Sequence, residues 1–393
     1  MLPRISLSQP QRLVFGRGCA AESAPHLRRS GCRCAFLVTG PQTRGLAEIL
    51  AEAIRREGLA TEIYDGVNQE PTIAMFDAAL AIARAVRPDA VVGIGGGSPL
   101  DVAKLVAALL DVGQSVEGLF GSDLLARRTT FLVCLPTTAG TGSEVSPNAI
   151  LMDESSRLKK GVVSPYLVPD ATFVDPLLTV SMPPAVTAAT GMDALTHCIE
   201  AYTNRFAHPI IDLYALEGIR LIGANLQRAV ENGSDLAARE SVALGSMYGG
   251  LCLGPVNTAA VHALSYPLGG EFHVPHGVSN AVLLPHVMAF NAPACPDRSA
   301  EVAVSLGVAT ARTPLGTARR GIERVQELAR RCGVPLSLSD LGVPITAVPE
   351  MAEMAMQVTR LLKNNPRELT LGEAARIYER AFQTPNGFPA SCD

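Results

Sequence analysis

The sequence predicts a two-domain protein, with an α/β domain over residues 1–181 followed by an all-α domain over residues 182–393. Its 393 residues exceed the usual ~100–200 residues of one domain. The first part alternates short apolar runs with helical patterns, which is typical of a parallel α/β sheet. Past Pro183-Pro184 long helical patterns take over, and no low-complexity linker separates the parts. We therefore expect two domains packed against each other.

Short apolar runs bounded by turn residues predict the strands of the first domain, and apolar residues at helical spacing predict its helices. The expected strands are residues 35–39, 61–64, 89–94, 130–136 and 171–175, the expected helices are 45–54, 76–86 and 102–110, and residues 151–160 are expected to form a hairpin. In the second domain we expect helices over 185–202, 209–231, 235–251, around His262, over 280–291, and further on to Phe382.

Composition narrows the class of protein. The formal net charge is −4 and no Lys/Arg run occurs, which argues against nucleic acid as a partner and favours a small-molecule substrate. The N-terminus lacks the apolar core of a secretory signal, and no apolar run approaches the ~20 residues of a membrane span. Nine scattered cysteines without paired C-x2-C knuckles indicate reduced thiols. We expect a cytoplasmic enzyme with no membrane partner.

A glycine-rich turn follows the strand predicted at 89–94. Gly95, Gly96 and Gly97 let a backbone approach a ligand closely, and Ser98 is expected to cap a helix with Pro99 at its first position. Free N–H groups at such a helix start favour an anion, for example a pyrophosphate. A turn of this kind can also simply redirect the chain, and the pattern is neither G-x-G-x-x-G nor a P-loop.

A second polar loop, residues 137–146, leaves the strand predicted at 130–136. It contains five hydroxyl side chains and two glycines, and it could be only a polar connection. Because it leaves the carboxyl end of a strand in the same sheet as the glycine turn, we expect both loops to line one crevice.

The helical domain contains a potential metal site. Asp193 and His197 are four residues apart, so a helix places them on one face. His262 and His276 flank Pro267-Leu-Gly-Gly270, which we expect to be a turn that folds them together. One carboxylate and three imidazoles suit Fe(II) or Zn(II) and not magnesium or calcium, although an acid–imidazole pair at this spacing also stabilises ordinary helices. We expect His26, His208 and His286 to be structural.

Four motifs together resemble the iron-containing, group III, alcohol dehydrogenases. They begin at Gly95, Pro136, Ala189 and Pro275, follow the order of that family, and extend the resemblance over essentially the whole chain. The resemblance implies a dehydroquinate synthase-like two-domain fold, with an α/β nucleotide-binding domain and a helical metal-binding domain around a catalytic cleft. It also implies the metal ligands Asp193, His197, His262 and His276, pyrophosphate contacts at Gly95, Gly96, Gly97 and Ser98, and further cofactor contacts at Thr137, Thr138, Thr141 and Lys159.

The implied activity is hydride transfer between NAD(P) and a small alcohol or aldehyde, with the metal as a Lewis acid. A maleylacetate reductase or a hydroxyacid–oxoacid transhydrogenase of the same fold is the nearest alternative. A glycerol-1-phosphate or dehydroquinate synthase-like enzyme, and a non-catalytic nucleotide-binding protein with structural histidines, are more distant ones. The ligand types leave Fe(II) against Zn(II) open, and the resemblance implies a homodimer.

The chain departs from the family pattern at two functional positions. Where many members have a second histidine near the nicotinamide, this chain has Tyr266, and His273 is a candidate to replace it in proton transfer. Where members that prefer NAD commonly have an aspartate, this chain has Gly40, and Arg44 lies near enough in sequence to meet a 2′-phosphate. NADP use is therefore open.

Overall fold

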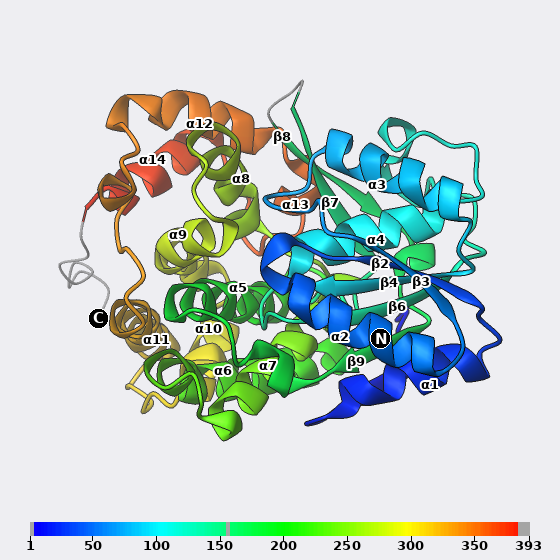
Figure 1. Ribbon diagram of the computed structural model, residues 1–393. Helices are drawn as coiled ribbons and strands as arrows, with labels where there is room; N and C mark the ends of the chain where they lie inside the picture. The colour runs from blue at the N-terminus through cyan, green and yellow to red at the C-terminus, as the bar shows by residue number, and fades with distance from the viewer. Residues whose placement is uncertain (1–3, 155–157, 384–393) are drawn as a thin grey trace. The chain divides into compact units, whose positions relative to one another are not determined.

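A computed structural model describes residues 4–154 and 158–383. The chain forms two compact units, one over Leu7–Met182 and the other formed mainly by the chain from Pro183 onward. The first is the α/β domain and the second is the helical domain (Figure 1).

The α/β domain is built on a six-stranded parallel sheet of strand order β1-β9-β6-β4-β2-β3. The chain places β3 on one side of β2 and then crosses to β4 on the other, so the order reverses between β2 and β4. Ligands of open α/β sheets bind at such a reversal, beyond the carboxyl ends of the strands. The strands are β1 Arg12–Phe15, β2 Cys34–Val38, β3 Ala60–Tyr64, β4 Ala90–Gly95, β6 Phe131–Pro136 and β9 Ala171–Val174.

Helices cover both faces of this sheet, α3 and α4 on one and α1 and α2 on the other (Figure 1). The alternation of side chains along β2 matches this arrangement: Phe36 and Val38 belong to the apolar cluster under α3 and α4, and Ala35 and Leu37 belong to the one under α1 and α2. The four helices span Ser23–Arg29, Arg44–Arg56, Ile73–Val86 and Gly97–Leu109 in the order α1 to α4.

The five predicted strands and the three predicted helices of this domain are present, and so is the hairpin, formed by β7 (Asn148–Asp153) and β8 (Leu158–Val163). The short β5, Gly121–Ser122, extends that hairpin into a small sheet. The expected cap at Ser98 is wrong, because α4 starts at Gly97 with Gly96 as its N-cap. Gly95 has a φ of 154°, a conformation open to glycine, and this lets the chain enter the helix earlier.

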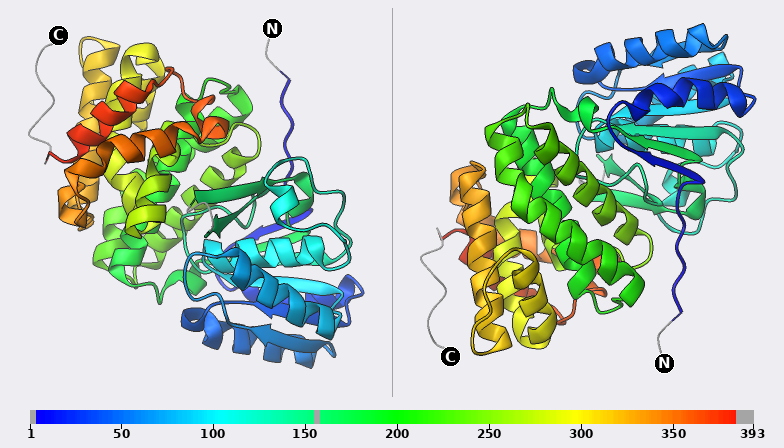
Figure 2. Two further views of the ribbon diagram at one scale, coloured as in Figure 1. Left: turned by 90° about the horizontal axis from the view of Figure 1, so that it is seen from above. Right: turned by 90° about the horizontal axis from the view of Figure 1, so that it is seen from below.

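The helical domain is organised around α5, which is buried over most of its length and packs against α6, α7 and α9. Gly191 allows the close approach of α6, since a Cβ there would lie 2.2 Å from Leu226 Cδ1. Figure 2 gives two further views of these helices, coloured green to red. They are α5 Pro184–Thr203, α6 Pro209–Glu231, α7 Leu236–Leu253, α8 Ala260–Phe272, α9 His276–Asn291, α10 Pro296–Ser305, α11 Pro314–Arg331, α12 Val348–Met356, α13 Thr359–Leu362 and α14 Leu371–Ala381.

Within the described part of the chain, no helix has the length and apolar character needed to cross a bilayer.

Candidate metal centre and cofactor loops

Asp193 and His197 lie in the buried part of α5, one helical turn apart. The position of their helix is fixed by close packing against α7 at Gly249. A Cβ on that glycine would lie 3.2 Å from His197 Cβ and 3.3 Å from the Ala194 carbonyl oxygen. The two side chains are therefore presented by a helix with little freedom to move.

His262 and His276 come from α8 and α9, which a short connection joins. The expected turn at Pro267–Gly270 is wrong: these residues lie inside α8, where they are largely buried, and packing overrides the helix-breaking tendency of the proline. The chain reverses instead at His273, which ends α8 with a left-handed φ of 54°. The start of α9 rests directly on α5, because a Cβ at Gly277 would lie 2.2 Å from the Ala189 carbonyl oxygen.

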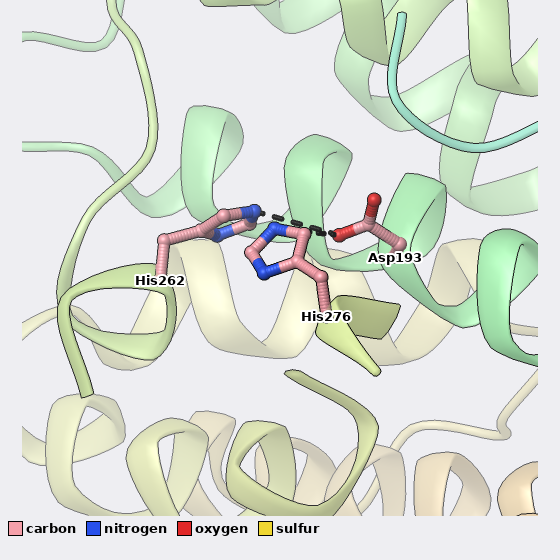
Figure 3. A group of neighbouring side chains, drawn as sticks. All are labelled: Asp193, His262 and His276. Carbon is pink, nitrogen blue, oxygen red and sulfur yellow. Dashed lines mark ion pairs between the residues drawn. The ribbon is translucent and has the colours of Figure 1, made fainter. Parts of the chain in front are cut away.

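Three of the four predicted ligands converge on one point. One ligand atom from each of Asp193, His262 and His276 lies within 4.8 Å of the other two (Figure 3). Asp193 Oδ1 is 3.5 Å from His262 Nε2 and 3.7 Å from His276 Nε2. The side chains of Asp193 and His262 are 4 % exposed, whereas that of His276 is 27 % exposed, so the cluster is accessible from the His276 side.

His197 lies beside this cluster and outside the mutually close set of three. Its Nε2 is 3.8 Å from Asp193 Oδ1, and its ring stacks on that of His262 with centroids 4.8 Å apart. All four predicted ligands are thus neighbours.

The charges of the cluster suit a cation. Burial by itself raises the pKa of Asp193, but the neighbouring His197, His276 and His262 outweigh burial and lower it. Burial lowers the pKa of His262, and Glu200 and Asp193 outweigh that effect and raise it to about 9. The carboxylate is therefore ionised, and the site stabilises positive charge on its imidazoles.

Two supporting residues escaped the sequence interpretation. Glu200 accepts hydrogen bonds from His262 Nδ1 and the Val261 N–H, both at 2.6 Å, which leaves His262 Nε2 directed at Asp193. Asn280 Nδ2 donates to Asp193 Oδ1 at 2.7 Å. A signal was present in their spacing, since Glu200 falls three residues after His197 and Asn280 four after His276, each on the helical face of a ligand.

The residues fit a divalent transition metal. Asn280 Nδ2 also lies 3.1 Å from His262 Nε2 and 3.3 Å from His276 Nε2, so one polar hydrogen donor faces the same three acceptor atoms that a metal ion would share. A carboxylate held against a histidine that ligates through its other nitrogen is the usual support of such metals. The mixed imidazole and carboxylate donors favour iron or zinc over magnesium or calcium.

The structure places the two proton-transfer candidates differently. Tyr266 is buried on α8 one turn after His262, and its ring centroid is 6.3 Å from that of His276. Burial raises the pKa of Tyr266, and a hydrogen bond with Arg360 opposes this rise. His273 is exposed at the end of α8, and no contact among the described residues joins it to the ligands.

The two cofactor loops of the α/β domain lie side by side, as expected from the sheet. A Cβ on Gly97 would be 2.5 Å from Thr141 Cγ2, and one on Gly96 would be 3.3 Å from Thr138 Cγ2. The Thr137 N–H donates to the Gly95 carbonyl at 2.9 Å. The glycines are thus required for the contact between the loops, which leaves a backbone surface at the carboxyl ends of β4 and β6.

A buried lysine holds the second loop in place. Lys104, on α4, is fully buried, and its Nζ donates to the carbonyls of Ser143 and Ser146 at 2.8 Å and to that of Asn148. The nearby Asp101 carboxylate accepts from Ser143 Oγ at 2.5 Å. Helix α4 therefore fixes both the glycine turn at its start and the polar loop beside it.

Three further predicted cofactor positions have packing partners. A Cβ at Gly40 would lie 2.4 Å from the Val67 carbonyl oxygen, which explains the glycine without reference to a ligand. The neighbouring Arg44 pairs with Asp65 at 2.7 Å and with Glu48 at 2.9 Å. Lys159 Nζ is 2.5 Å from Glu70 Oε1, so this lysine of β8 is held by an acid in the loop between β3 and α3.

Comparison with known proteins connects both domains to one family. Residues 10–176 match the family described as "Iron-containing alcohol dehydrogenase", and residues 187–382 match "Fe-containing alcohol dehydrogenase family, C-terminal". Long-chain-alcohol dehydrogenase 1 of Geobacillus thermodenitrificans is 40 % identical over 383 residues, which cover 94 % of this chain and 96 % of that protein.

Solved structures agree with this similarity. A 1,3-propanediol oxidoreductase superposes with a TM-score of 0.94 at 36 % identity, covering 97 % of this chain and 100 % of that one. A sulfoacetaldehyde reductase of Bifidobacterium kashiwanohense, solved in complex with NAD+, superposes with a TM-score of 0.88 at 28 % identity, covering 98 % of this chain and 100 % of that one. The predicted two-domain fold is confirmed.

Proposed function

This chain belongs to the iron-containing alcohol dehydrogenase family and is an oxidoreductase that interconverts alcohols and carbonyl compounds, and on that premise we propose that Asp193, His197, His262 and His276 hold its catalytic metal. The observation that carries the proposal is the convergence of Asp193, His262 and His276 within 4.8 Å, with Glu200 fixing the orientation of His262. We propose Fe(II) as the ion, since the donor set accepts iron or zinc and the family description names iron.

The residues around the proposed metal have separate roles. A bound divalent ion supplies Lewis-acid polarisation of the substrate oxygen, and a bound nicotinamide supplies the hydride acceptor or donor. Asp193 and the imidazoles orient toward one point, and Glu200 keeps the proton of His262 on Nδ1 so that Nε2 can act as a ligand. The more exposed side chain of His276 marks the side from which a substrate enters.

We assign Tyr266, and not His273, to the substrate hydroxyl or carbonyl. The Tyr266 phenol lies on the ligand-bearing face of α8, where its hydroxyl can donate a hydrogen bond to a substrate beside His276. His273 remains a candidate for passing a proton onward to solvent, because it is exposed at the end of the same helix. A His273→Ala variant that retains full turnover and an unchanged pH–rate profile removes it from that role.

For the cofactor, we propose contacts from Gly95, Gly96, Gly97 and Ser98 to the pyrophosphate, from Thr137, Thr138 and Thr141 to the ribose and adjacent phosphate, and from Lys159 to the ribose. The backbone surface left by the glycines and the start of α4 support this assignment. Hydride transfer also requires that the nicotinamide reach the substrate carbon at the metal.

We propose NAD as the preferred cofactor. Arg44, the one cation that the sequence offered for a 2′-phosphate near Gly40, is already paired with Asp65 and Glu48. A 2′-phosphate would have to compete with these carboxylates and would meet their repulsion. The ratio of kcat/KM for NAD over NADP tests this: we expect a ratio above ~10, and a ratio below one contradicts the proposal.

The function is tested by metal content and turnover measured on the same samples. Wild-type protein loaded with Fe(II) should reduce NAD in the presence of a panel of small alcohols, and a chelator should abolish this. Asp193→Asn and His276→Ala should lose both metal and turnover. His208→Asn is a matched control, because His208 only caps α6 by accepting the Ile210 N–H. Turnover that survives metal removal would contradict the proposed mechanism.

Two further properties belong to this proposal. We propose a cytoplasmic location, in keeping with eight cysteines that are free thiols among the described residues. We also propose a homodimer, which light scattering coupled to size-exclusion chromatography tests directly.

A further inference from the structure

An arginine lies next to the metal cluster and takes no part in the chemistry described above. Arg360 is on the short helix α13, which packs against α8, and its positive charge lies beside the Tyr266 side chain, against which the neighbouring Leu361 packs. Tyr266 in turn lies beside His276, with ring centroids 6.3 Å apart. Tyr266 therefore connects the guanidinium to the candidate metal centre.

Several arginines of the helical domain pair with an acid, and Arg360 does not pair with one among the described residues. In the described part of the chain, its polar neighbour is the Tyr266 phenol, and no carboxylate forms an ion pair with it. Half-buried cations are normally paired. Arginines that do pair with an acid in this domain are Arg228 with Asp235, Arg298 with Asp212, and Arg367 with Glu373.

The apolar surroundings of Arg360 and Tyr266 strengthen the interaction of the guanidinium with an anion. Tyr266 packs with the apolar residues Ala263 and Leu361, and Val358 and Leu362 flank them. A guanidinium at the edge of an apolar cluster interacts more strongly with an anion than one in open solvent does. The acids closest to the metal cannot serve, because Asp193 faces the ligand point and Glu200 is engaged by His262.

The charges of the whole site also favour an anion beside Arg360. A bound divalent ion would be balanced by the carboxylates of Asp193 and Glu200, and no acid among the residues that the structure describes pairs with the guanidinium of Arg360. A planar carboxylate fits the fork of a guanidinium in a bidentate geometry. The guanidinium of Arg360 thus offers an anion two parallel N–H donors.

We propose that Arg360 forms a carboxylate-binding subsite beside the metal centre, so that the preferred substrates are ω-hydroxy acids and the corresponding aldehyde acids, while Tyr266 keeps its single O–H for the reacting oxygen. The hydroxyl or carbonyl end occupies the metal side near His276, and the carboxylate lies on Arg360. This inference rests on the proposed metal site and adds the class of substrate. Arg360 selects substrates that carry a carboxylate, and it neither donates nor accepts the reacting proton or hydride.

The test compares substrates that differ only in charge. ω-Hydroxy acids of four, five and six carbons are measured against the ω-hydroxy amides of the same length, with wild type, Arg360→Met and Arg360→Lys. We expect one acid to be preferred over its amide by about 10- to 100-fold in kcat/KM, the range for a hydrogen-bonded charge pair. Arg360→Met should abolish this preference while leaving the amide within ~3-fold, and Arg360→Lys should restore part of it.

A binding measurement separates the subsite from catalysis. Calorimetry with hexanoate, which lacks the reacting hydroxyl, should detect binding to wild type and a loss of at least ~10-fold in Arg360→Met. Arg376→Met, on the exposed face of α14, is the matched control and should leave this binding unchanged.

The outcomes separate this inference from the proposed function. Turnover of neutral alcohols and metal content report on the metal site alone. If wild-type protein binds no metal and oxidises no neutral alcohol, the proposed function is contradicted. Equal losses for acid and amide in Arg360→Met would show that Arg360 only supports the fold of α13. An increased KM for NAD alone would assign Arg360 to the cofactor. A wild-type preference for the amide would also overturn the carboxylate subsite.

Discussion

Replacing Glu200 by glutamine isolates the contribution of the residue that orients His262. Glu200 receives hydrogen bonds of 2.6 Å from His262 Nδ1 and from the Val261 N–H, and it is buried with them. Glutamine keeps the volume and can still accept one of these bonds, but it removes the negative charge. It also allows the amide to donate to Nδ1, which would move the imidazole proton to Nε2, the nitrogen needed for the metal.

The expected loss follows from these contacts. Substitution of a partner that orients a metal ligand typically weakens metal binding by about 10- to 100-fold, which is about 1.4 to 2.7 kcal/mol. The short and buried bonds of Glu200 place it at the upper end, because burial strengthens a charge-assisted hydrogen bond. Glu200→Asp, which keeps the charge and shortens the reach, should lie between wild type and glutamine.

The assay is competition for Fe(II) or Zn(II) against a chelator of known affinity, with metal content as the second readout. Glu217→Gln is the control: Glu217 is a partly exposed acid on α6 that pairs with Arg220. If folded Glu200→Gln protein binds the metal with an affinity within ~2-fold of wild type, Glu200 does not orient His262 for metal binding. Glu200 would then serve only to attach the start of α8 to α5.

Two other predictions concern parts of the chain away from the metal. Lys104→Met should weaken NADH binding by at least ~10-fold in a fluorescence titration and lower the stability by about 1–3 kcal/mol, because it leaves the carbonyls of Ser143 and Ser146 without their donor and so releases this loop; unchanged NADH affinity would contradict a role in the cofactor site. Burial lowers the pKa of His286 to about 4, with Arg380 contributing, so the unfolded chain takes up this proton near pH 6.5, before the folded protein does. The contribution of neutral His286 to the free energy of unfolding should therefore be fully present above pH 6.5 and should decrease as the pH falls toward 4. At pH 5.0 the expected loss is about 2 kcal/mol. His286→Phe should lack this part of the pH dependence in chemical unfolding, and equal slopes for the two proteins would contradict the account.

Much of the fold could be predicted because its signals are local. Buried parallel strands are continuous apolar runs, as in the strand that ends at Gly95, and amphipathic helices repeat their apolar residues at helical spacing. The ligands on α5 followed from the same geometry, since a helix puts residues four apart on one face. His262 and His276 could be nominated by residue type, and the resemblance placed them in the same set.

Other features depend on packing between distant segments and left weaker signals. The turn between the two histidines was assigned to Pro267–Gly270, but buried contacts keep that proline in a helix and the chain reverses at His273. Ser98 was an obvious cap by composition, yet the φ of Gly95 lets the helix begin sooner. Arg44 looked available for a phosphate until its partners Asp65 and Glu48 were located. Pairings of this kind are set by the tertiary structure, which one sequence does not give.

The most direct test of the metal assignment is to locate the ion. A crystal of Fe(II)-loaded protein measured at the iron absorption edge should give one anomalous peak at bonding distance, about 2.0–2.2 Å, from a carboxylate oxygen of Asp193 and the Nε2 atoms of His262 and His276. We expect His197 to be the fourth ligand of the ion in the same map. A peak at any other place in the chain, or a fully loaded protein with no peak among these residues, would contradict it.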